Sequence, residues 1–154
     1  MDIGEIRVFI AMRYWRPFSP EVAREVAAWE PDEVVLLPLY PQFSTTTTGS
    51  SLRTWSRAAK AAGLTAPSRA ICCYPTAPSL VEAHVRLIAA AMDETPAPFR
   101  LLFSAHGLPE RIVARGDPYQ WQVEQTAAAV AAAVETTRRT ALDWRVCYQS
   151  RIGP

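Results

Sequence analysis

Short apolar runs alternate with stretches of helical periodicity along the whole chain. The apolar runs predict five strands, at residues 7–12, 33–39, 68–74, 99–105 and 143–148. Between them, apolar residues at helical spacing predict four helices, at about residues 19–30, 52–62, 76–92 and 119–137. Near-continuous apolar strands separated by helices are typical of parallel sheets with helices on both faces. The predicted fold class is therefore α/β.

A hydroxyl-rich stretch separates the second predicted strand from the second predicted helix. Residues 40–51 read YPQFSTTTTGSS and form a predicted loop. One glycine and no lysine make this stretch a poor match to a phosphate-binding P-loop. Its simplest interpretation is a helix start capped by Thr or Ser oxygens.

Composition and charge exclude several classes of protein. The chain has 154 residues, of which 49% are hydrophobic and 20% charged, which is typical of a globular protein. No apolar run approaches the roughly 18–20 residues of a membrane span, and acidic residues near the start disfavour a signal peptide. A net charge of +1 lacks the basic excess of a nucleic-acid binder. Three cysteines, two of them adjacent, are typical of reduced thiols, so we expect a cytoplasmic protein.

Residues suited to ligand binding follow the predicted strands. In open parallel sheets, ligands bind beyond the carboxyl ends of the strands, so these residues are expected on one rim. They combine aromatic rings, hydroxyls, arginines and one histidine, which suits a flat, apolar, anionic ligand. The candidates are Arg13, Tyr14, Tyr40, Ser44, Tyr74 and His106.

His106 is the strongest single candidate for chemistry. It follows a predicted buried strand, and Gly107 is expected to leave room for a ligand to come close. A neutral imidazole accepts a proton near pH 7 and also binds Fe(II). The alternative is a histidine that only hydrogen-bonds its loop. His84 differs, because it lies on the apolar stripe of its helix and is expected to be a packed core residue.

Four motifs together resemble the ferrochelatase family. The most specific is FSAHGLP at residues 103–109, followed by RGDPY at residues 115–119. Residues 12–17 (MRYWRP), residues 39–51 (LYPQFS through GSS) and residues 148–154 (YQSRIGP) agree in the expected order. The resemblance extends over nearly the whole chain after the first six residues.

The resemblance implies both a fold and a reaction. The family inserts ferrous iron into protoporphyrin IX, or into coproporphyrin III in one branch, in a cleft between two similar α/β domains. Residues 1–63 would then complete the first domain, and residues 64–154 would form most of the second. His106 matches the active-site histidine and would accept pyrrole protons, bind the iron, or do both. Arg13, Tyr14, Tyr40, Ser44 and Tyr74 match positions that contact the porphyrin.

The chain departs from the family pattern in its length. The family is about twice as long, and the acidic residue that works opposite the histidine falls outside these residues. We therefore expect a piece of a longer protein that is weakly active or inactive by itself. The alternative is a non-catalytic tetrapyrrole- or metal-binding module derived from the same fold.

The resemblance also bears on cofactors and partners. Thr45 occupies a position where some members have a cysteine ligand of a 2Fe–2S cluster, so that cluster is not expected. The expected partners are porphyrin and ferrous iron, with no nucleic acid and no transmembrane segment. Peripheral membrane contact and the oligomeric state are left open.

Overall fold

The computed structural model describes residues 4–150 and divides them into two compact units. Unit 1 comprises residues 4–40 and 45–72, and unit 2 comprises residues 41–44 and 73–150. Both units are built from helices and parallel strands, so the α/β class is confirmed. Residues 151–154 of the YQSRIGP motif lie outside the described residues.

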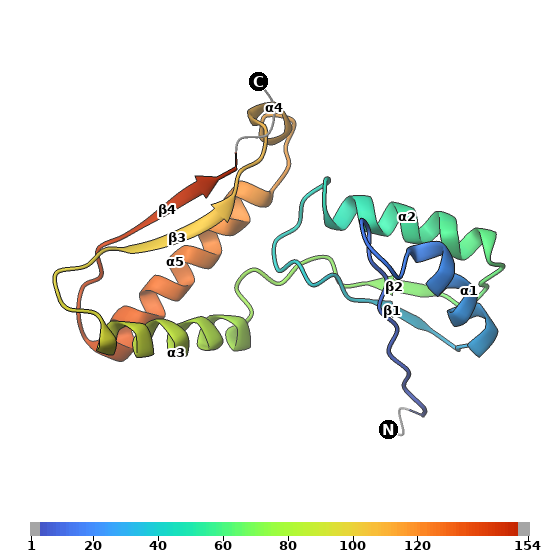
Figure 1. The fold of residues 1–154 in the computed structure, drawn as a ribbon, viewed down its shortest axis with the longest axis horizontal. Helices are drawn as coiled ribbons and strands as arrows, with labels where there is room; N and C mark the ends of the chain where they lie inside the picture. Colours follow the sequence, from blue (N-terminus) through green and yellow to red (C-terminus); the bar gives the residue numbers. More distant parts are fainter. Residues whose placement is uncertain (1–3, 151–154) are drawn as a thin grey trace. The chain divides into compact units, whose positions relative to one another are not determined.

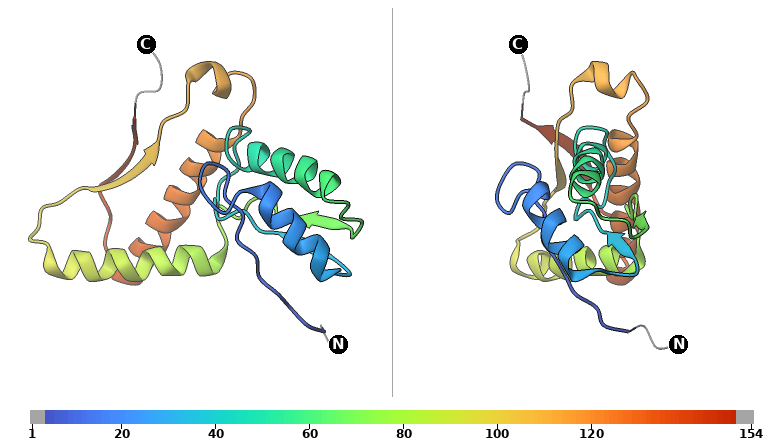
Figure 2. Two further views of the ribbon diagram at one scale, coloured as in Figure 1. Left: turned by 45° about the vertical axis from the view of Figure 1, so that its right-hand side comes forward. Right: turned by 90° about the vertical axis from the view of Figure 1, so that its right-hand side faces the viewer.

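Unit 1 packs two helices against a pair of parallel strands (Figures 1 and 2). Helix α1 spans Ser19–Trp29 and α2 spans Thr48–Ala61, while β1 (Val34–Leu36) pairs in parallel with β2 (Ser68–Ala70). Their shared core contains Val22, Ala23, Val26, Trp55 and Ala58, with partly buried neighbours from β1. The apolar residues of α1 thus lie on the side of the helix that faces α2 and the strands, as helical periodicity requires.

The helix ends in unit 1 follow from local chemistry. At the start of α1, the Phe18 N–H donates to Glu21 Oε2 at 3.3 Å, which satisfies a donor that the helix itself leaves unpaired. After α2, Gly63 has a φ of 71°, in the left-handed region that glycine adopts without steric cost. The predicted end of the second helix is therefore confirmed.

Unit 2 contains a longer parallel pair and two long helices. Strand β3 (Leu101–His106) pairs with β4 (Trp144–Gln149) in a register that sets His106 opposite Gln149. Helices α3 (Pro78–Glu94) and α5 (Tyr119–Arg138) pack together, and the short α4 (Glu110–Val113) lies in the loop after β3 (Figure 1). The core is formed by Val85, Val130 and Val134, with Phe103 and Leu142 packed against it.

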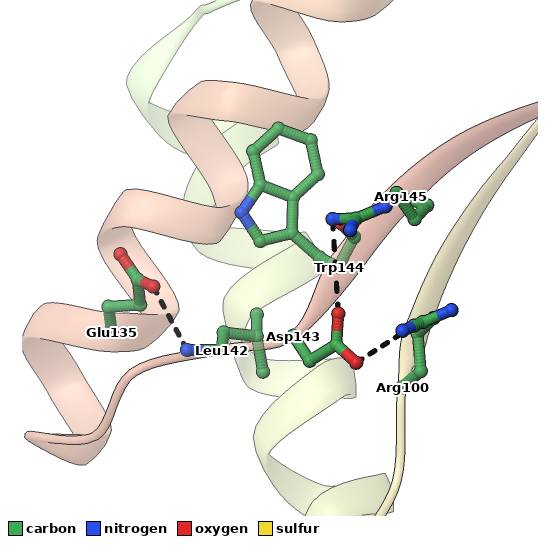
Figure 3. A network of polar contacts seen from close by, with 6 residues as sticks. All are labelled: Arg100, Glu135, Leu142, Asp143, Trp144 and Arg145. Atoms are coloured by element: carbon green, nitrogen blue, oxygen red, sulfur yellow. Dashed lines mark hydrogen bonds and ion pairs between the residues drawn. The ribbon is translucent and has the colours of Figure 1, made fainter.

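A polar network holds the amino end of the β3–β4 pair (Figure 3). Asp143 accepts Arg100 Nε at 2.8 Å, and its second oxygen lies 3.9 Å from Arg145 Nη1. Beside it, the Leu142 N–H donates to Glu135 Oε1 at 3.0 Å. These contacts tie the ends of both strands to α5. The candidate histidine lies at the other end of the same pair.

The first predicted strand is wrong for the described residues. Residues 7–11 form no strand. Within the described residues, the only β-type pairing of this segment is an isolated bridge between Met12 and Phe18. Its apolar side chains are mostly exposed, with Val8 84% accessible, although Phe9 packs on the core of unit 1. An apolar run alone does not make a strand, because the backbone also needs a neighbour to pair with.

Burial on both strand faces is also not seen within residues 4–150. Residues along β3 alternate between half-buried and exposed, and Leu102 is 57% accessible. In β1, Val35 is likewise exposed. All three residues of β2 are exposed as well, so neither described strand pair is buried on both faces.

One helix boundary differs from expectation, and strand pairing decides where the compact units divide. Helix α2 begins at Thr48, so the last residues of the predicted loop are helical. The compact units divide at residues 72 and 73, because β2 pairs with β1 and so belongs to unit 1. Residues 41–44, in contrast, belong to unit 2. The boundary of the family's two domains at residue 63 stays a prediction.

Candidate functional site

His106 is the last residue of β3 and its side chain is exposed. The strand delivers it to the carboxyl end of the parallel pair, where ligands bind in open α/β sheets. It is not packed in the interior, so its imidazole is accessible to solvent and to a ligand. Geometry and chemistry together keep His106 as the leading candidate for proton transfer or metal binding.

Gly107 is required by the backbone of the neighbouring strand. A Cβ at this position would lie 3.1 Å from the Ser150 carbonyl oxygen and 3.3 Å from that of Gln149. The Gly107 N–H donates to the Gln149 oxygen at 2.7 Å. The expectation that this glycine makes room for a ligand is therefore wrong on this side, because the end of β4 occupies the space.

A cavity of about 420 Å³ lies beside the carboxyl ends of β3 and β4. It is lined by two tyrosines, by residues of α4 and its flanking loop, and by the start of α5. The lining residues are Gly107, Leu108, Glu110, Val113, Ala114, Tyr119, Gln120 and Tyr148. Leu108, Val113 and the two tyrosine rings give the wall apolar surface, and Glu110 and Gln120 add polar groups to it.

The two tyrosines of the cavity have raised pKa values. Burial raises the pKa of the Tyr148 phenol to about 12, and the Glu124 carboxylate adds to the rise. The Tyr148 hydroxyl donates to Glu124 Oε1 at 3.4 Å. Burial also raises the pKa of Tyr119, while a hydrogen bond with the His106 backbone lowers it in part. Both phenols therefore stay protonated at neutral pH.

The Ser44 hydroxyl is hydrogen-bonded inside unit 2. Ser44 is 1% exposed, and its hydroxyl donates to Asp117 Oδ2 at 3.0 Å. Burial keeps the Ser44 side chain off the surface of unit 2, and a substrate contact for Ser44 stays a prediction. The second Asp117 oxygen accepts the Tyr119 N–H at 3.0 Å.

The whole segment around Ser44 is fastened to unit 2. The Tyr74 N–H donates to the Pro41 carbonyl at 2.8 Å, and the Phe43 N–H donates to Gln122 Oε1 at 2.7 Å. Gln42 Nε2 donates to Thr126 Oγ1 at 2.9 Å. Tyr74 itself is half-buried.

In unit 1, Arg13 and Tyr14 form a local pair. The Arg13 guanidinium carbon lies 4.7 Å from the centre of the Tyr14 ring, within range of a cation–π interaction. Arg13 Nε donates to Ser50 Oγ at 3.0 Å, which joins two of the motifs. The rings of Tyr14 and Tyr40 are 73% and 50% exposed and thus available to a ligand.

Sequence reasoning missed several residues of this region. It gave no role to Asp117, Tyr119 or Ser50, although all three lie within quoted motifs. The available signal was the position of Asp117 two residues before a predicted helix, where a carboxylate accepts backbone N–H groups. His84 was also misjudged: it is exposed, and its Nδ1 lies 2.8 Å from the Leu80 carbonyl oxygen.

A resident metal centre is not visible in the described part of the chain. Within residues 4–150, no three His, Cys, Asp or Glu side chains gather where they could hold a metal ion. The same residues contain no helix of the length and apolarity that a bilayer crossing demands.

Known proteins are similar to this chain over nearly its whole length. A family model described as Ferrochelatase matches residues 2–154. A ferrochelatase of Phenylobacterium zucineum is 58% identical over 152 residues, which cover 97% of this chain and 42% of the relative. One of Caulobacter vibrioides is 56% identical with the same coverage, and one of Hyphomonas neptunium is 56% identical over 97% of this chain and 40% of its own length. The chain thus spans about two fifths of these relatives.

Proposed function

The chain belongs to the ferrochelatase family, and from that premise we propose that it acts in the insertion of Fe²⁺ into protoporphyrin IX to form protohaem. The observation that carries this proposal is the exposed His106 at the carboxyl end of β3, within the FSAHGLP motif. Iron is the substrate in this reaction. Coproporphyrin III remains a second porphyrin to be tested.

Metal insertion needs two pyrrole protons to leave and Fe²⁺ to take their place on the four nitrogens. His106 in its neutral form would accept a pyrrole proton, or bind the incoming iron through a ring nitrogen, or do both in turn. Because its side chain is exposed, a proton that it accepts can pass on to water. The reaction releases two protons per iron, with no change in the oxidation state of the metal.

The remaining candidates would bind the macrocycle. Arg13 supplies a fixed positive charge for a propionate, because guanidinium pairs well with carboxylates. Tyr14, Tyr40 and Tyr74 supply aromatic surface for a flat ring system. Support for these roles comes from the exposed rings of Tyr14 and Tyr40 and from the Arg13–Ser50 hydrogen bond.

We propose weak or absent turnover for the 154-residue chain by itself, because it spans about two fifths of its relatives' length. The same observation favours a second function, a module that binds tetrapyrrole or metal without catalysis.

The proposed location is cytoplasmic. Among the described residues the three cysteines form no disulfide, and Thr45 offers no thiolate for an iron–sulfur cluster.

The test is to follow binding and metal insertion with protoporphyrin IX and Zn²⁺ or Fe²⁺ by absorbance and fluorescence. We expect porphyrin binding, and we expect any insertion to be lost in His106→Ala. His84→Ala is the matched control, because His84 is the other histidine of the chain and lies on α3. Absence of porphyrin binding would count against both functions. Binding without insertion would favour the non-catalytic module, and vigorous turnover would refute the weak-activity proposal.

A further inference from the structure

Asp117 joins residues of two separate motifs: Ser44 in residues 39–51 and Tyr119 in residues 115–119. It is 7% exposed, and both of its carboxylate oxygens accept hydrogen bonds of 3.0 Å. One bond comes from the Ser44 hydroxyl and the other from the Tyr119 N–H. A carboxylate is costly to bury unless its oxygens are hydrogen-bonded, so this arrangement calls for a structural reason.

The contact with Tyr119 fixes the start of α5. Asp117 precedes the helix by two residues, so its negative charge lies at the positive end of a 20-residue helix. The Tyr119 side chain then forms a wall of the cavity beside Gly107, and its hydroxyl is hydrogen-bonded with the backbone of His106. Asp117 therefore acts on the residue that holds the carboxyl end of β3.

The contact with Ser44 fixes a second segment. Ser44 is almost fully buried, so its hydroxyl donates inside the protein instead of to water. The neighbouring Phe43 N–H donates to Gln122 on the same helix, at 2.7 Å. Residues 41–44 are thus hydrogen-bonded to Asp117 and to the first turns of α5.

We propose that Asp117 is a positioning residue that holds His106 in place through Tyr119, and that Ser44 completes this connection. The importance of this connection for metal insertion rests on the proposed function. The connection itself is a property of unit 2. Neither Asp117 nor Tyr119 needs to touch substrate for it to operate.

The experiment uses NMR of the two histidine rings in the 154-residue chain. His106 and His84 are the only histidines, and a His84→Gln variant assigns their signals. Tyr119→Phe removes the hydroxyl that meets the His106 backbone while keeping the ring. Asp117→Asn keeps the shape of the side chain and removes its charge. Val130→Ala, a core change within the same helix, is the matched control for lost stability alone.

We expect Tyr119→Phe and Asp117→Asn to displace the ring signals of His106. The His84 signals should stay in place in both variants, and Val130→Ala should move neither histidine. His106 signals in Tyr119→Phe that coincide with those of the parent chain would overturn the proposal. That variant decides the question even where Asp117→Asn does not fold.

The outcome is independent of the proposed activity. Displaced His106 signals in a chain that binds no porphyrin would refute the proposed function and uphold the positioning role. Unchanged signals in a chain that binds porphyrin would do the reverse. Where insertion is measurable, Tyr119→Phe should lower kcat more than it raises KM, because the group acts on the histidine and not on the porphyrin.

Discussion

The Arg13 guanidinium donates through Nε to the Ser50 hydroxyl across 3.0 Å, although the two residues are 37 positions apart in the chain. The same guanidinium lies over the ring of Tyr14. Two motifs of unit 1 are therefore joined by a side chain that the proposed function assigns to porphyrin binding. The orientation of Arg13 therefore depends on Ser50 of α2, which does not itself need to contact the ligand.

Ser50→Ala should weaken porphyrin binding by releasing Arg13. A hydrogen bond to a charged group contributes on the order of 1.5 kcal/mol, so we expect the affinity to fall by about tenfold. Titration of protoporphyrin IX against tryptophan fluorescence measures the change. Ser56→Ala is the matched control, because Ser56 is an exposed serine on the same helix. Equal losses in both variants would contradict the assigned role of Ser50.

Gly107→Ala should loosen the junction between the ends of β3 and β4. The new methyl group would meet the Ser150 oxygen at 3.1 Å, so the strand ends must separate by a few tenths of an ångström. We expect a loss of about 1 kcal/mol in the free energy of unfolding, together with displaced His106 NMR signals. Denaturant unfolding and the histidine spectra check the two effects. A variant with parent-like stability and spectra would show that the junction tolerates a side chain.

Tyr148 should ionise far above the usual pH for tyrosine. Its pKa is raised to about 12 in the folded chain, whereas an unfolded tyrosine ionises near pH 10. Between these values unfolding releases a proton, so the contribution of Tyr148 to stability is complete below about pH 10 and is lost as the pH rises through 12. The difference in phenolate absorbance between the parent and Tyr148→Phe gives the midpoint. Glu124→Gln should lower it, since the neighbouring charge contributes to the rise.

Val130→Ala should destabilise unit 2 by about 2 kcal/mol, because it removes two methyl groups from a fully buried position. Gln125→Ala on an exposed position of the same helix is the control and should change stability by no more than about 0.5 kcal/mol. Chemical denaturation followed by circular dichroism measures both. Similar values for the two variants would mean that α5 does not pack as described.

The local pattern of the sequence was sufficient for most elements. Apolar spacing located all four long helices, and Gly63 marked the end of the second one. It failed for residues 7–11, because the formation of a strand depends on a pairing partner elsewhere in the chain. It also failed for His84, since a position at the edge of an apolar stripe can face either the core or solvent.

By itself, the sequence determined the α/β class, the family and the position of a histidine at the end of a strand, since each depends on local residue order. Only the tertiary structure decided what the neighbouring motif residues do. Ser44 and Asp117 are 73 positions apart, and their contact is buried. Gly107 is needed because β4 ends against it. Such roles arise from distances between remote segments, which spacing along the chain does not encode.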